Sequence, residues 1–164
     1  TVSKTFSFYD EQKYLDGIAN VVKNTGLQGR YEYYHKDPTI IFDSAHNPEG
    51  VENFLGEFAN EAGSYKKRTL LFGVMRDKAI GDMLQMLSEY FDEIMLTDLE
   101  YERAAKVEEI CERCKQLNIK VTPIKGHTKF VQNFMTKNSG ECLVILGSMY
   151  LLGEIKQQLL AGVA

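Results

Sequence analysis

The stretch Thr39-Ile-Ile-Phe-Asp-Ser-Ala-His-Asn-Pro-Glu-Gly50 decides the fold, because it joins a buried strand to the start of a helix. Residues 39–42 are β-branched or apolar, which is typical of a strand buried on both faces. Asn47-Pro-Glu-Gly50 supplies an N-cap, a proline at the first helical position and an acid in the first turn. Asp43 and His46 therefore lie where a strand ends and a helix begins. Ligands bind at that edge of open α/β sheets, and the helix start favours anions such as phosphates.

Strands and helices alternate along the rest of the chain. We expect strands at 31–34, 39–43, 69–74, 93–97, 119–123 and 143–146, and helices at 10–23, 51–62, 80–91, 104–117, 128–137 and 150–160. Most strands are continuous apolar runs, which indicates a largely parallel sheet with helices on both faces. The turn at 35–38 makes the first two strands antiparallel neighbours. Thr128 is the expected cap of its helix.

The composition is that of one soluble globular domain: 164 residues, 44% hydrophobic and 26% charged. A net charge of −4 without a basic run argues against a nucleic-acid partner. No apolar stretch reaches the ~20 residues that span a bilayer. Three cysteines, an odd number, favour a reducing compartment, so we expect a cytoplasmic protein. The chain begins at Thr1 without an initiator methionine or a signal-peptide pattern, which predicts a fragment of a longer protein.

Polar residues follow several of the predicted strands. Asp43 and His46, the turn 76–78, residues 97–98 and Gly147-Ser148 are expected to meet at one edge of a parallel sheet. For each turn taken alone, a structural role as a helix cap or solvated loop explains the polar residues as well as a ligand-binding role does. His46 could donate to a phosphate or stack on a base. Arg30 fits either an exposed cation that begins a strand or a bidentate phosphate clamp.

Several motifs are absent from the sequence. It has no G-x-x-x-x-G-K-[ST] phosphate loop, no G-x-G-x-x-G and no G-x-S-x-G. Cys111 and Cys114 form C-x-x-C inside a predicted helix without a second ligand pair, which favours apolar packing over zinc or redox chemistry. His35 and His127 lie in predicted turns, and we assign them no role. No metal ligand is predicted in this chain.

Four motifs together resemble one family. The run Asp43-Ser-Ala-His-Asn-Pro48 closely resembles the D-G-A-H-N-P signature of the C-terminal domain of folylpolyglutamate synthases and dihydrofolate synthases, members of the Mur ligase superfamily. Gly29-Arg30 is similar to the P-G-R motif, Phe72-Gly-Val-Met-Arg-Asp-Lys78 to F-G-x-x-x-D-K-D, and Ile145-Leu-Gly-Ser-Met-Tyr150 to the final G-S-L-Y. The resemblance runs from about Gly17 to the end. Ser44 replaces the usual glycine, and Ala79 stands where a second acid is frequent.

The resemblance implies a fold and a reaction. It implies a three-layer Rossmann-like α/β domain over residues 1–164, with about six strands, one of them antiparallel. The parent ligases use ATP and Mg²⁺ to convert a carboxylate of folate or dihydropteroate into an acyl phosphate, which the amine of glutamate attacks. The P-loop, most magnesium ligands and a carbamylated lysine belong to a preceding ATPase domain, which is absent from this chain. We therefore expect this fragment to be an inactive monomer alone and to close over ATP beside its N-terminal partner domain.

The resemblance also assigns roles to single residues. Arg30 matches the arginine that reaches the nucleotide phosphates, where it neutralises charge on the transferred phosphoryl group. Asp43 matches an acid on the ribose or base side, and His46 matches the signature histidine beside the nucleotide, so all three are expected to be catalytic and to bind the cofactor. Ser148 matches a serine near the amino-acid pocket. Asp77-Lys78 matches a pair whose role is partly structural.

Two alternatives to the folate ligase remain open. One is the C-terminal domain of a cell-wall Mur ligase, which shares the D-x-A-H-x-P core. The segment from Phe72 to Lys78 and the Gly-Ser-Met-Tyr run favour the folate branch. The other is a stand-alone nucleotide-binding module without catalysis. A P-loop domain encoded upstream would support the ligase.

Overall fold

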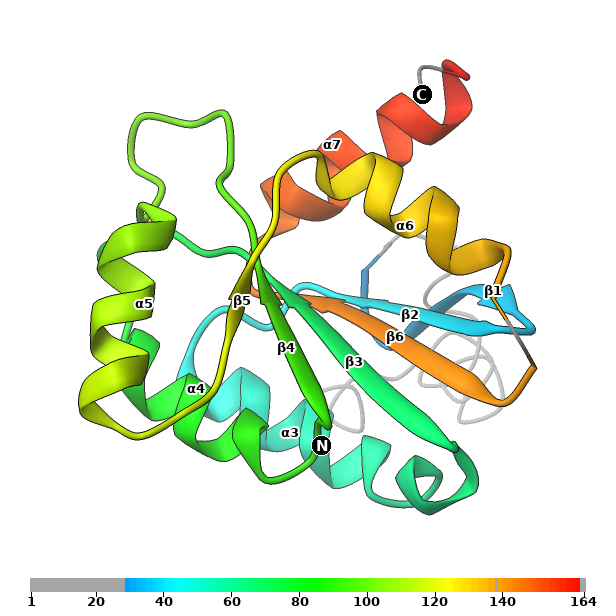
Figure 1. Ribbon diagram of the computed structural model, residues 1–164, viewed down its shortest axis with the longest axis horizontal. Helices are drawn as coiled ribbons and strands as arrows, with labels where there is room; N and C mark the ends of the chain where they lie inside the picture. Colours follow the sequence, from blue (N-terminus) through cyan, green and yellow to red (C-terminus); the bar gives the residue numbers. More distant parts are fainter. Residues whose placement is uncertain (1–28, 138, 163–164) are drawn as a thin grey trace, which may run out of the picture.

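A six-stranded sheet with strand order β1-β2-β6-β3-β4-β5 forms the middle layer of the computed structural model, which describes residues 29–137 and 139–162 (Figure 1). The strands are β1 Glu32–Lys36, β2 Thr39–Asp43, β3 Lys67–Phe72, β4 Glu93–Leu96, β5 Thr122–Pro123 and β6 Glu141–Leu146. The helices are α3 Pro48–Phe58, α4 Ile80–Ser88, α5 Val107–Gln116, α6 His127–Met135 and α7 Met149–Leu160, with a 3₁₀ turn at Ala62–Ser64. Strand β1 pairs antiparallel with β2, and every other pair is parallel. The predicted fold class is confirmed.

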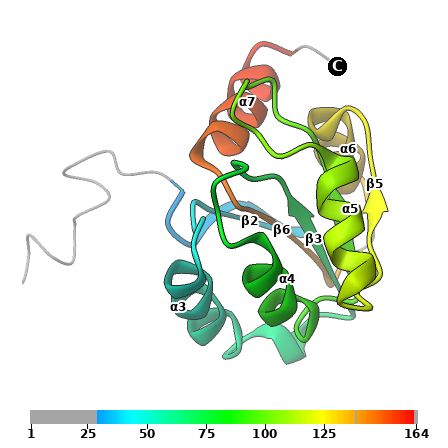
Figure 2. The ribbon, with the colours of Figure 1, turned by 90° about the vertical axis from the view of Figure 1, so that its left-hand side faces the viewer.

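Helices cover both faces of the sheet (Figure 2). Buried apolar side chains form one cluster on each face. Successive residues of a strand point to opposite faces. In β2, Ile41 packs with residues of α3, α4 and α5, whereas Ile40 and Phe42 pack with residues of α6 and α7. Strand β6 lies between β2 and β3, and Cys142 to Leu146 are all fully buried. This double burial explains why the strand sequences are continuous apolar runs.

The stretch from Thr39 to Gly50 adopts its predicted structure. Strand β2 ends at Asp43, and α3 begins at Pro48. Asn47 is the N-cap, and its side-chain oxygen accepts the backbone N–H of Gly50 at 2.8 Å. This bond satisfies one of the amide groups that a helix start leaves without an internal partner.

The structure corrects three local predictions. Strand β5 is only Thr122–Pro123, because residues 117–119 end α5: Asn118 has a left-handed φ of 57°, and Ile119 N–H bonds to Cys114 O at 2.8 Å. Thr128 is not a cap; Gly126 is the N-cap of α6, and the Thr128 hydroxyl donates to Gln158 at 2.5 Å. Helix α3 ends at Phe58 rather than near residue 62, because Asn60 and Glu61 donate to carbonyls three residues back.

Two histidines also lie outside the turns predicted for them. His35 belongs to β1, and its Nδ1 lies 2.7 Å from Pro38 O. His127 is the first residue of α6, is 8% exposed, and has ring nitrogens 3.1 Å from Thr97 Oγ1 and from Glu154 Oε1. The predicted helix at 10–23 lies outside the described residues.

Candidate active site

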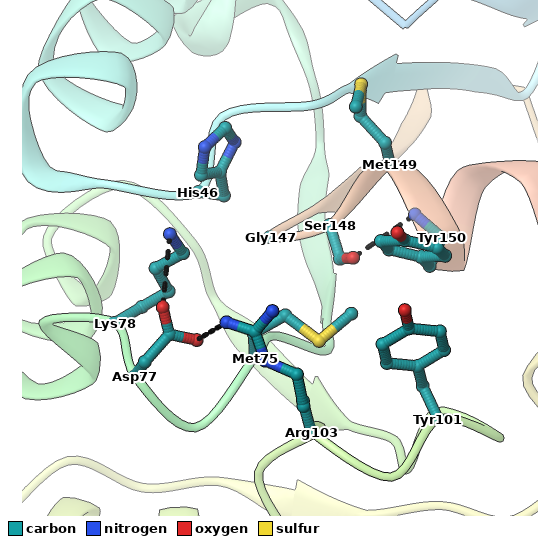
Figure 3. Close-up of a pocket in the computed structure, with 10 residues that line it drawn as sticks. All are labelled: His46, Met75, Asp77, Lys78, Tyr101, Arg103, Gly147, Ser148, Met149 and Tyr150. Atoms are coloured by element: carbon teal, nitrogen blue, oxygen red, sulfur yellow. Dashed lines mark hydrogen bonds and ion pairs between the residues drawn. The ribbon is translucent and has the colours of Figure 1, made fainter.

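A cavity of about 190 Å³ opens at the edge of the sheet where the parallel strands end (Figure 3). Four loops line it, which follow β2, β3, β4 and β6. The lining residues are His46, Met75, Asp77, Lys78, Tyr101, Arg103, Gly147, Ser148, Met149 and Tyr150. The structure thus brings together His46, Asp77-Lys78 and Gly147-Ser148, as the strand pattern predicts. Asp43, Arg76 and residues 97–98, which the same pattern grouped with them, do not line this cavity.

Gly147 and Ser148 connect β6 to α7 at the cavity. Gly147 has a φ of 117°, and a Cβ at this position would lie 2.6 Å from Gly73 O, so the close approach of two backbones requires glycine. Ser148 is the N-cap of α7, is 3% exposed, and accepts the Tyr150 N–H through its Oγ at 3.2 Å. No acceptor for the Ser148 hydroxyl hydrogen lies among the described residues, so this hydroxyl can donate to a ligand.

A small charge cluster forms one wall of the cavity (Figure 3). Asp77 lies between two cations, with Oδ2 3.5 Å from Lys78 Nζ and Oδ1 3.6 Å from an Arg103 guanidinium nitrogen. A backbone N–H bond, then Lys78 and Arg103, lower the pKa of Asp77. The cluster of two cations and one anion keeps a positive charge, which attracts anionic groups.

Exposed apolar side chains form the rim opposite this cluster. Tyr101 and Tyr150 stack with ring centroids 4.5 Å apart and planes tilted by 31°. Their exposed fractions are 41% and 53%, and that of Met149 is 64%. The hydrogen bond and charge interaction with Tyr150 raise the pKa of Tyr101. A surface that combines such a rim with a charged wall suits a ligand that has both an apolar part and anionic groups.

His46 projects from the loop between β2 and α3. Its Nδ1 lies 2.9 Å from the carbonyl oxygen of Ser44, which can only accept, so Nδ1 carries a hydrogen. In the neutral ring Nε2 is therefore free to accept a hydrogen bond, and in the protonated ring it donates one. The residue can contact either a donor or an anion at the cavity.

Asp43 and Arg30 do not line this cavity. Asp43 is 6% exposed; its Oδ2 accepts the Tyr31 N–H at 2.8 Å and its Oδ1 accepts the Ala45 N–H at 2.7 Å. Burial raises the pKa of Asp43, against the lowering effect of both N–H groups and of Arg30. Arg30 is exposed at the turn before β1. The two residues are close enough for the charge of Arg30 to act on Asp43.

Tyr101 and Arg103 line the cavity, but the sequence pattern did not predict them as site residues. They belong to the loop between β4 and α5, of which the strand pattern selected only residues 97–98. Backbone bonds from Arg76 N–H to Arg103 O and from Ala105 N–H to Val74 O, both 2.9 Å, hold this loop beside the loop that follows β3. The position of this loop directly after a predicted strand is the sequence feature that would have pointed to these two residues.

The described residues hold no metal-binding group of three or more His, Cys, Asp or Glu side chains. All three cysteines are free thiols. Burial raises the pKa of Cys111 and Cys114, and Cys114 belongs to the apolar core, so the packing interpretation fits the C-x-x-C pair. None of the described helices combines the length and apolar character needed to cross a membrane.

The chain belongs to the family described as "Mur ligase, glutamate ligase domain", which matches residues 29–163. The dihydrofolate synthase/folylpolyglutamate synthase of Bacillus subtilis (strain 168) is 26% identical over 132 residues, covering 80% of this chain and 30% of the relative. The Escherichia coli (strain K12) protein of the same name is 33% identical over 103 residues, covering 62% of this chain and 23% of the relative.

Solved structures give the same assignment of the fold. E. coli FolC in complex with DHPP and ADP superposes with a TM-score of 0.77 at 23% identity, covering 95% of this chain and 36% of that one. A Yersinia pestis folylpolyglutamate synthase/dihydrofolate synthase complexed with AMPPNP and Mn ion has a TM-score of 0.69 at 25% identity, covering 81% and 31%. This chain therefore spans about a third or less of the length of these relatives.

Proposed function

We propose that this chain is the C-terminal domain of an ATP-dependent, folate-type glutamate ligase. The observation that carries the proposal is the cavity at the carboxyl edge of the sheet, which places His46, Ser148 and the Lys78–Asp77–Arg103 cluster together. Family membership and the relatives named folylpolyglutamate or dihydrofolate synthase support the same class of enzyme. The other substrates are ATP and a folate or dihydropteroate, and an N-terminal ATPase domain is the partner. The three free thiols fit a cytoplasmic enzyme.

The proposed reaction has two steps. A carboxylate oxygen of the folate-type substrate attacks the γ-phosphorus of ATP, which forms an acyl phosphate and releases ADP. The amine of glutamate then attacks the carbonyl carbon; the C–O bond to phosphate breaks, and the amine loses a proton as the amide forms. The acyl phosphate hydrolyses if water reaches it, so a domain that closes over the site protects it.

We assign the cavity to the incoming glutamate. Lys78 and Arg103 supply positive charge for carboxylates, and the Ser148 hydroxyl supplies a neutral donor. Tyr101 and Tyr150 on the opposite rim would exclude water from the reacting amine. His46 lines the same cavity, and we propose that it lies between the glutamate and the nucleotide phosphates.

We assign the nucleotide side to Arg30, with Asp43 and His46 next to it. Arg30 is an exposed guanidinium on a well-held turn, suited to the charge that develops on the transferred phosphoryl group. We expect the divalent cation that accompanies ATP, Mg²⁺ in this proposal, to take its protein ligands mainly from the N-terminal ATPase domain, as the family resemblance implies.

The test uses the intact gene product that contains this chain. We expect ADP release that requires both glutamate and a folate or dihydropteroate, and a product heavier than the substrate by one glutamyl residue. Release that requires a cell-wall muramyl precursor instead would assign the domain to a Mur ligase. ATP binding without ADP release under any of these conditions would overturn the ligase proposal in favour of a non-catalytic module.

A further inference from the structure

Exposed apolar side chains gather on one rim of the cavity. Six large apolar side chains are exposed among residues 29–137 and 139–162, and three of them, Tyr101, Met149 and Tyr150, lie on this rim. Met75, from the loop that follows β3, lines the same cavity. Such a concentration of exposed apolar groups beside a charged wall is typical of a surface that binds a ligand.

The two tyrosines of this rim have anchored backbones. The Tyr101 N–H donates to Leu99 O at 2.8 Å, and the Tyr101 carbonyl accepts the Ala104 N–H at 3.0 Å. The Tyr150 N–H donates to Ser148 Oγ at the start of α7. The two rings also contact each other, with centroids 4.5 Å apart (Figure 3). An aromatic surface held in this way loses little freedom when a ligand packs on it.

The incoming glutamate cannot cover this apolar rim. Its side chain has two methylene groups, and the rest of the molecule is two carboxylates and an amine. A single aromatic side chain offers roughly 150–250 Å² of surface, and the rim has two of them beside Met149. In the proposed reaction, the group that meets the glutamate amine is the acyl phosphate of the acceptor. The rim is therefore left for the part of the acceptor next to its reacting carboxyl.

The charged wall of the cavity matches glutamate alone. In the proposed assignment, Lys78 and Arg103 bind its two carboxylates. Among the described residues that line the cavity, His46 is the one further basic side chain. An acceptor that already ends in glutamate would bring a third carboxylate, because an α-carboxylate lies near its reacting γ-carboxyl. Against the Tyr101–Tyr150 rim this charge would lose water without gaining a partner, which is unfavourable.

An aryl carboxylate suits both sides of the cavity. In dihydropteroate the reacting carboxyl is bonded directly to a benzene ring, so a flat and uncharged group lies one bond from the carbon that the amine attacks. Aromatic rings pack favourably on one another in offset or edge-to-face arrangements, and a methionine sulfur packs favourably at a ring edge. Tyr101, Tyr150 and Met149 provide partners of both kinds on one rim.

We propose that Tyr101, Tyr150 and Met149 are specificity-determining residues that bind the aromatic ring of the acceptor. The site then selects an aryl carboxylate, as in dihydropteroate, over the γ-carboxylate of a folyl glutamate. The reaction that it favours is the addition of a first glutamate rather than the lengthening of a glutamyl chain. This inference rests on the proposed function and identifies the acceptor.

The kinetic test compares two acceptors, dihydropteroate and tetrahydrofolyl monoglutamate, in the intact ligase. We expect the wild type to have a kcat/KM about tenfold higher for dihydropteroate. The double variant Tyr101→Ala/Tyr150→Ala should lower kcat/KM for dihydropteroate about tenfold to a hundredfold, because the ring loses its packing partners. The value for the monoglutamate and the KM for glutamate should change by less than about threefold.

Two controls separate ring packing from other effects. Tyr101→Phe/Tyr150→Phe keeps both rings and should keep the preference for dihydropteroate. Leu160→Ala removes an 85% exposed apolar side chain at the other end of α7 and should change none of the constants. A loss of preference in the phenylalanine variant would assign the effect to the hydroxyls and overturn the proposal.

The remaining outcomes distinguish this inference from the proposed function. Equal losses for both acceptors in the alanine variant would assign the rim to contact with the ATPase domain, and a wild type that prefers the monoglutamate would also overturn the inference. In both cases the ligase assignment stands, because ADP release still requires glutamate and an acceptor. No glutamate-dependent ADP release with either acceptor would overturn the proposed function and this inference together.

Discussion

The Tyr31 hydroxyl donates a 2.5 Å hydrogen bond to Oε1 of Glu61, which connects the turn after Arg30 to the chain beyond α3. The hydroxyls of Tyr33 and Tyr65 donate to the same carboxylate. Burial opposes ionisation of Glu61, but the three phenol bonds outweigh it and lower the pKa of this carboxyl below 4.5. The negative charge of Glu61 therefore stabilises the folded state.

Glu61 should give the domain a dependence of stability on acid pH. The pKa of Glu61 is lower in the folded than in the unfolded chain. Its contribution to the free energy of unfolding is therefore full above pH 4.5, and it is lost as the pH falls through the pKa of the folded state. We expect urea unfolding to show a smaller loss of stability between pH 5 and pH 3 in Glu61→Gln than in the wild type. Glu57→Gln, at an exposed site in α3, is the control and should keep the wild-type slope. Parallel slopes for all three proteins would contradict the assignment.

Tyr33 should give the free energy of unfolding a dependence on alkaline pH that is opposite in direction to that of Glu61. Burial first, and then its hydrogen bond to Glu61, raise the pKa of Tyr33 to about 12, from an ordinary value of 10.0. Its contribution is present below 10 and is lost as the pH rises through the folded value. Ultraviolet titration should show this phenol ionising at a higher pH than an ordinary tyrosine, and Tyr33→Phe should remove that step. Glu61→Gln should move the step to lower pH, and a step that stays in place would rule out the carboxylate as a cause.

Gly147 should tolerate no side chain. Gly147→Ala introduces a Cβ that meets Gly73 O at 2.6 Å in a backbone with φ of 117°, so we expect a loss of about 2 kcal/mol or more in the free energy of unfolding. Gly56→Ala is the matched control. A Cβ at Gly56, inside α3, meets no atom within 4 Å, so this change should stabilise by about 0.5–1 kcal/mol. Equal effects at the two sites, measured by urea unfolding, would refute the close-approach argument.

Much of the fold follows from local sequence, whereas part of the site does not. The apolar run of β6 and the cap at Asn47 are local signals, and both predict what the structure contains. The residue type of Thr128 favours a helix cap, but α6 begins one residue earlier, after Gly126 with its left-handed φ of 70°. The Thr128 hydroxyl donates to Gln158 instead. Arg103 reaches the cavity through backbone bonds between two loops that are distant in sequence, and no local periodicity encodes such pairing.

Asp43 illustrates the same limit in another way. The sequence places it correctly at the end of β2, and the family resemblance assigns it to the nucleotide. Its bond with the Ala45 N–H is local, whereas its bond with the Tyr31 N–H depends on where residues 29–31 lie against the sheet. The side-chain type and position in the chain are thus predictable, whereas the number of unoccupied acceptor sites is a property of the tertiary structure.

Arg103 should determine selectivity for an amino acid with two carboxylates. Its side chain is 70% exposed and its contact with Asp77 is 3.6 Å, so Arg103→Gln should leave the unfolding temperature nearly unchanged. In the intact ligase we expect KM for glutamate to rise about tenfold to a hundredfold, which corresponds to the ~1.5–3 kcal/mol of a hydrogen bond to a charged group. The preference for glutamate over glutamine should fall by a similar factor, with KM for ATP unchanged. Arg68→Gln, which breaks the ion pair with Asp92 at the other end of β3, is the control and should change neither constant. A rise in KM for ATP instead would place Arg103 on the nucleotide side and move glutamate out of this cavity.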